Sequence, residues 1–180
     1  VYDLTSSRVG AAREVVVDEL VLEAYASFWR GRLVPQWFRV GIQKLYADPN
    51  TKIPLLSPAL VAARANQLYP LDELDTVPSV EAREYEVWEA QSYGMVIFMA
   101  DRFGIDTVTE LATTANTYET FAEAYQGVMG EDIAALIPSW EVWIFNDRAP
   151  AAYSVDLYGP PTLTPTNIPT ETPIPPSRTP

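Results

Sequence analysis

The sequence predicts a single, mainly helical domain followed by a tail without a core of its own. Apolar residues recur every three or four positions across 11–145, which is the period of an α-helix. Apolar residues make up 48% of the 180-residue chain, enough for one substantial core but not for two ordinary domains. Only residues 1–4 and 8–9 have a pattern that hints at strand.

The first predicted helix spans 11–30, where Val16, Leu20, Ala24 and Phe28 repeat every four positions. Further valines widen this apolar surface. We therefore expect the helix to be central in the fold and largely buried.

Capping residues and helix breakers delimit the remaining helices. Ser57 and Pro58 form an N-cap followed by proline at the first helical position, and Ser79 caps the longest of the later helices. Glycine is a natural helix stop, so we expect that helix to end at Gly104. The predicted helices after the first are 37–46, 57–68, 79–104, 106–115, 117–129 and 131–145, the last interrupted at Pro138.

The composition changes sharply near Gly159, and residues 159–180 carry half of the 16 prolines together with six threonines. Proline fixes the backbone φ angle and removes hydrogen-bond donors, so we expect a disordered, polyproline-like linker or stalk. This change divides the chain into two units, a folded domain over 1–158 and a Thr/Pro-rich linker over 159–180. Such stalks are typical of exported surface proteins. We expect an extracellular or cell-surface location, with the export signal outside a chain that begins at Val1.

The chain contains no cysteine and no histidine, and its formal net charge is −12. Disulfides, thiolate metal sites, a Ser-His-Asp triad and histidine-ligated zinc are therefore impossible within it. The acidic charge argues against nucleic acid as a partner, because that needs a cationic patch. No run of 18 apolar residues exists, so we expect no membrane-spanning segment.

Several spaced motifs follow one another in a recognisable order over residues 11–145. An apolar helix is followed by Pro35-Gln36-Trp37-Phe38-Arg39-Val40-Gly41, by Tyr69-Pro70-Leu71-Asp72-Glu73-Leu74, by Ala90-Gln91-Ser92-Tyr93 in a helix that ends in Phe103-Gly104, by Phe121-Ala122-Glu123-Ala124-Tyr125, and by a terminal helix with two tryptophans. This order resembles the peptidase MA-like family of gluzincin zinc metallopeptidases. The resemblance implies a zincin-like helical domain, with an upstream β-sheet of the same fold lacking from this chain.

In that family the first helix carries His-Glu-x-x-His, whose histidines bind zinc and whose glutamate is the general base. The third zinc ligand is a glutamate on the next helix. The resemblance places Glu19 at the catalytic glutamate, and Asp18 and Leu22 at the two histidines. It places Val40 at the third ligand. All three ligands are replaced, so the resemblance implies an inactive homologue that binds neither zinc nor another cofactor.

Tyr93 lies in the segment that closes the cleft in the family, where a tyrosine can stabilise an oxyanion. Without zinc, we favour the interpretation of Tyr93 as a buried aromatic side chain with a hydrogen-bonded hydroxyl.

Glu14, Asp18, Glu19 and Glu23 could form an oxygen-rich cation site, but carboxylates spaced along a helix more often form a solvated stripe. The five tryptophans could form a carbohydrate platform, although helical core spacing favours packing.

Three functions remain open at this point. We favour a non-catalytic, peptidase-like module that binds a peptide, a protein or a neighbouring domain of a longer chain through its residual cleft. The second is a metal-dependent hydrolase that uses Asp18, Glu19 and Glu23, although Asp18 and Glu23 point about 140° apart around the helix. The third is a spacer domain. A solvent-accessible hollow over Glu19 would favour the binding module. A hollow filled by other side chains would favour the spacer domain.

Overall fold

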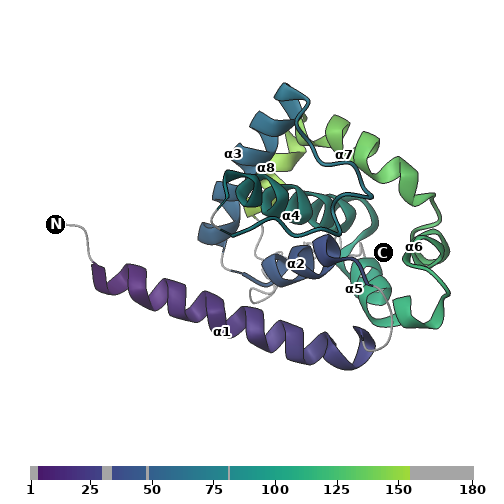
Figure 1. Ribbon diagram of the computed structural model, residues 1–180, viewed down its shortest axis with the longest axis horizontal. Coiled ribbons are helices and arrows are strands. Elements are labelled where there is room, and N and C mark those ends of the chain that lie inside the picture. Colours follow the sequence, from purple (N-terminus) through teal and green to yellow (C-terminus); the bar gives the residue numbers. More distant parts are fainter. Residues whose placement is uncertain (1–3, 30–33, 48, 81, 155–180) are drawn as a thin grey trace, which may run out of the picture.

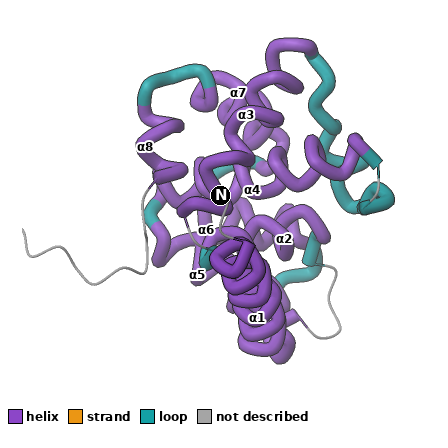
Figure 2. Tube along the Cα trace, turned by 90° about the vertical axis from the view of Figure 1, so that its left-hand side faces the viewer, coloured by secondary structure: helices purple, strands orange, loops and turns teal. Residues whose placement is uncertain are grey.

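The structure is a computed structural model that describes residues 4–29, 34–47, 49–80 and 82–154, with the backbone alone for 4–14 and 49. Its regular secondary structure in these ranges is helical, as the tube in Figure 2 shows, so the predicted mainly α fold class is confirmed. None of the described helices is long and apolar enough to cross a membrane. The predicted linker over 159–180 lies outside the described residues. The helices are α1 (Leu4–Trp29), α2 (Gln36–Leu45), α3 (Pro49–Ala65), α4 (Arg83–Phe103), α5 (Ile105–Thr114), α6 (Phe121–Met129), α7 (Leu136–Ile144) and α8 (Arg148–Ser154), with short 3-10 turns at Ala115–Thr117 and Ile133–Ala135.

Helix α4 is the central element of the fold (Figure 1). It contacts α2, α3, α5, α7 and α8, and every residue from 90 to 99 is buried. A helix segment that is buried on all sides must be surrounded by other elements, which explains why residues 90–99 are mostly apolar or small. The buried Gln91 amide is paired with the Tyr69 backbone, at 2.8 Å for both its oxygen and its nitrogen. It ends at Gly104, whose positive φ of 90° favours glycine, as predicted.

Helix α1 lies along one edge of the molecule, and its N-terminal half extends beyond the body (Figure 1). The prediction of a central, largely buried helix is therefore wrong. Among its described side chains, from Val15 to Trp29, the buried ones are the stripe of Val21, Tyr25 and Trp29, on a helix that contacts α2 and α5. Val16 and Leu20 keep 57% and 64% of their surface exposed. The expected strand at 8–9 is also wrong, because α1 already begins at Leu4.

Helix α3 begins at Pro49 and continues through Pro54 and Pro58, so Ser57 is not an N-cap. Interior prolines each remove one backbone hydrogen bond. The compensation is a buried face against α4 and α8, made of residues at helical spacing: Lys52, Leu55, Ala59 and Ala62. The packing of this face outweighs the local preference of Ser57 and Pro58 for a helix start, from which we predicted that the helix begins at 57.

Two further boundaries differ from the predictions. Ser79 does not cap α4; its carbonyl accepts a hydrogen bond from the Ala82 amide at 2.9 Å in a turn before the helix. Pro138 does not interrupt a helix, because α7 begins at Leu136 and tolerates proline in its first turn. Helix α8 was not predicted as a separate element.

The aromatic residues mainly form the core. All five tryptophans are buried, and Trp140 and Trp143 dock α7 onto the body from one helical face, as expected. Their burial confirms the prediction that the tryptophans pack in the core and do not form a carbohydrate-binding platform.

Candidate functional site

Asp18 belongs to an ion-pair network that connects three helices. Its carboxylate lies 3.8 Å from Lys44 Nζ on α2, and the same ammonium group lies 3.4 Å from the Glu89 carboxylate on α4. The Lys44 side chain is only 13% exposed, so these ion pairs are less screened by solvent than surface pairs. Asp18, the first of the three positions that the resemblance assigns to zinc ligands, thus holds α1 against the body.

Glu19 and Leu22 line a hollow on the surface between α1 and α2, with a volume of about 380 Å³. Arg39 of α2 also lines it, and its guanidinium group lies 5.5 Å from the centre of the Trp29 ring in a cation–π arrangement. Glu19 itself is exposed. The side chain predicted to face a residual cleft therefore borders a shallow, polar depression.

Val40 and Leu22, at the other two ligand positions, are partly buried and pack against the core. Their aliphatic side chains offer no lone pair to a metal ion. The described residues include no group of three or more Asp or Glu side chains that could hold a metal ion. Asp18 turns to Lys44 while Glu23 lines the hollow with Glu19, so the three carboxylates of the hydrolase hypothesis do not converge.

Tyr93 is fully buried in the middle of α4 and does not line the hollow over Glu19. Its ring packs edge-on against Tyr153 of α8, with the ring centres 5.1 Å apart. Burial raises the pKa of the Tyr93 hydroxyl well above its ordinary value. The expectation of a hydrogen-bonded hydroxyl is wrong for the described part of the chain, in which this oxygen has no partner.

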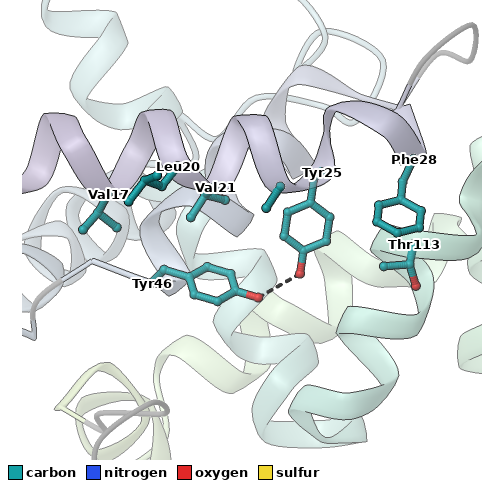
Figure 3. A pocket seen from close by; sticks show the side chains of 8 residues that line it. Val17, Leu20, Val21, Tyr25, Phe28, Tyr46 and Thr113 are labelled. Atoms are coloured by element: carbon teal, nitrogen blue, oxygen red, sulfur yellow. Dashed lines mark hydrogen bonds between the residues drawn. The ribbon is translucent and has the colours of Figure 1, made fainter.

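A second depression along α1 was not predicted from the sequence. This apolar groove has a volume of about 500 Å³ and is lined by Val17, Leu20, Val21, Ala24, Tyr25, Phe28, Tyr46 and Thr113 (Figure 3). The hydroxyls of Tyr25 and Tyr46 are hydrogen-bonded to each other at 2.8 Å and form part of its wall. Desolvation by burial, and next this hydrogen bond, raise the pKa of Tyr25.

The sequence signal for this groove is the predicted four-residue repeat of α1, of which Leu20, Ala24 and Phe28 line the groove and Val16 does not. The repeat predicts a core-facing stripe, whereas the buried residues of α1 are offset from it by one position, at Val21, Tyr25 and Trp29.

Comparison of the chain with family models, curated proteins and solved structures finds no significant match.

Proposed function

We propose that this protein is a catalytically inactive, metallopeptidase-like module that binds a protein segment in the apolar groove along α1. The observation that carries the proposal is the groove itself. Leu20, one of the side chains that line it, is 64% exposed, and Phe28 is 38% exposed. Contiguous exposed apolar surface is unfavourable in water and marks interaction sites.

The partner that fits is a segment with clustered apolar side chains between basic residues. Apolar side chains match the lining of the groove, and each buried Leu or Phe contributes about 1.5–3 kcal/mol. Basic flanks match the charge of the surroundings, since Glu19 and Glu23 are exposed on the same helix and the whole chain carries a net charge of −12. Electrostatic complementarity would increase the association rate and suppress acidic competitors.

Three observations support the absence of peptidase activity. Leu22 and Val40 have no metal-binding atom, and the Asp18 carboxylate is occupied by Lys44. Tyr93 is fully buried and cannot reach a substrate in the hollow over Glu19. Without a zinc-bound water, Glu19 has no nucleophile to activate.

The Thr/Pro-rich stretch over 159–180 supports a place in an exported or cell-surface protein, where it would act as a spacer.

The experiment is fluorescence anisotropy of the full chain with labelled peptides that carry apolar residues at helical spacing and either lysine or glutamate flanks. We expect the basic-flanked series to bind and the acidic-flanked series to bind more weakly. Replacement of Leu20 with Asp should weaken binding at least tenfold, because it places a charge in the groove.

The matched control is Val142→Asp on α7, at the opposite end of the molecule from α1 (Figures 1 and 2), where the valine is 76% exposed. It should bind as the unmodified protein does. Equal loss in both variants, or no binding in either peptide series, would refute the groove as the site. Chelator-sensitive cleavage of the same peptides would refute the inactive assignment separately.

A further inference from the structure

Three buried polar atoms belong to side chains of α4, α7 and α8, which pack against one another. They are the hydroxyl oxygens of Tyr93 and Tyr153 and the indole Nε1 of Trp140. All three side chains are completely buried, and none of these atoms has a hydrogen-bond partner within the described residues. Buried polar atoms of this kind are rare in folded proteins, because each one forfeits its hydration.

Other buried indoles of the same core do have acceptors. Trp29 donates to the Ala112 carbonyl at 3.0 Å, Trp88 to the Leu74 carbonyl at 2.9 Å, and Trp143 to the Asp101 carboxylate at 2.8 Å. A missing acceptor is therefore not a general feature of the indoles in this core. Among the buried aromatic side chains of the described residues, the polar atoms without a partner are those of Tyr93, Trp140 and Tyr153.

Gly94 shows how close two of these atoms lie. A Cβ at this glycine would be 2.9 Å from the Tyr153 hydroxyl and 3.0 Å from Trp140 Nε1. Both atoms thus approach one point and are separated by at most about 6 Å, which is the span of two hydrogen bonds through one water. The Tyr93 side chain comes from the neighbouring residue of α4, and its ring contacts that of Tyr153.

We propose that one buried water molecule bridges Trp140 Nε1 and the hydroxyls of Tyr93 and Tyr153. The indole can only donate, so the water accepts its hydrogen bond. The two water hydrogens are then available to the two tyrosine oxygens, and buried waters typically make about three such bonds. This water ties α8 to α4 and α7.

A neutral ligand fits better than an anion, although all three groups can donate. The three side chains that supply these atoms, Tyr93, Trp140 and Tyr153, carry no positive charge that would compensate a buried anion. Burial also raises the pKa of both tyrosines, which keeps the two hydroxyls neutral.

The first test uses Tyr93→Phe, Tyr153→Phe and the double variant, which remove the hydroxyls and conserve the rings. With a bridging water, each single change lowers the melting temperature by about 2–4 °C, and the double change lowers it by less than the sum. If the atoms are dry and unsatisfied, Phe relieves a desolvation cost and raises the melting temperature. Tyr25→Phe, which breaks the direct bond to Tyr46, calibrates the loss expected for one hydrogen bond.

The second test needs no variant. Rotating-frame NMR on the full chain should show a cross-peak between the Trp140 indole hydrogen and a water of long residence time. Absence of this cross-peak overturns the proposal. Crystals grown in bromide distinguish a bound anion from water. An anomalous peak among the three groups would identify an anion and overturn the proposal.

Discussion

The three positions that the resemblance assigns to zinc ligands make two kinds of contact. The Asp18 carboxylate pairs with Lys44, so it connects α1 to α2. Leu22 borders the hollow over Glu19 and packs against the core, as does Val40 from α2. Neither aliphatic side chain can coordinate a metal, and the two helices that carry them contact each other.

This residue-scale arrangement leads to a reconstruction experiment. If α1 and α2 keep the family geometry, the triple variant Asp18→His, Leu22→His, Val40→Glu should bind about one equivalent of zinc. The two histidines are four residues apart on one helical face, and the glutamate comes from the adjacent helix. Metal content after dialysis against zinc, together with a rise in melting temperature, measures this outcome.

The matched control is the double variant Asp18→His, Val40→Glu, which supplies only two ligands and keeps Leu22. It should retain much less zinc after the same dialysis. Equal zinc in the double and triple variants would show that the three positions do not converge, and would count against the resemblance.

At the scale of elements, α2 and α4 approach so closely that only glycine fits between them at position 41. A Cβ at Gly41 would lie 2.3 Å from Val96 Cγ2 and 2.7 Å from the Ser92 carbonyl oxygen, both on α4. The carbonyl belongs to the backbone of the central helix and cannot rotate away. The close approach therefore fixes the position of α2, which carries Arg39, Val40 and Lys44.

Gly41→Ala should destabilise the protein by about 2–4 kcal/mol, because a methyl group forces two packed helices apart. Urea unfolding followed by circular dichroism measures the change. The control is Gly127→Ala on α6, where the added methyl meets the outer end of the Tyr118 side chain. That side chain can move, and alanine is favoured over glycine in a helix by about 1 kcal/mol, so this variant should be neutral or stabilised. Similar losses in both variants would contradict the backbone contact as the cause.

Across the whole molecule, burial raises the pKa values of several tyrosines. The chain has no histidine, so no imidazole changes charge near neutral pH. Burial is the main cause of raised pKa values at Tyr25, Tyr69, Tyr85, Tyr93, Tyr125 and Tyr153. For Tyr125 burial, and then the nearby Glu131 carboxylate, raise the pKa to about 12. The buried tyrosine hydroxyls therefore keep their protons until strongly alkaline pH.

We expect stability to fall steeply above pH 10. A tyrosine in the unfolded chain loses its proton near pH 10, whereas buried Tyr125 keeps it until about pH 12. The unfolded state then binds fewer protons than the folded state, so the free energy of unfolding decreases as pH rises through this window. Urea midpoints across the window, with tyrosinate absorbance as a second probe, test this. Tyr125→Phe should reduce the slope, and a midpoint that does not change between pH 10 and 12 would contradict the expectation.

The sequence by itself determined those features that depend on local chemistry. Helical periodicity fixed the fold class, and Gly104 ended α4 because a positive φ angle favours glycine. The start of α2 after Pro35 and the end of α6 at Gly130 follow from residues whose preferences act within one turn. The spacing of Trp140 and Trp143 likewise gave the face on which α7 docks.

The tertiary structure decided which face of each helix is covered. The apolar surface of α1 is wide enough to pack in several orientations, and contact with α2 and α5 selected the stripe of Val21 and Tyr25, which left Leu20 exposed beside a groove. Helix α3 passes through Pro54 and Pro58 because its buried face offsets two lost hydrogen bonds. The burial of the Tyr93 ring against Tyr153 depends on α8, which lies far away in sequence, and leaves the Tyr93 hydroxyl without a hydrogen-bond partner among the described residues. Periodicity records that a residue is apolar, but burial and hydrogen bonding depend on neighbours that only the folded chain brings together.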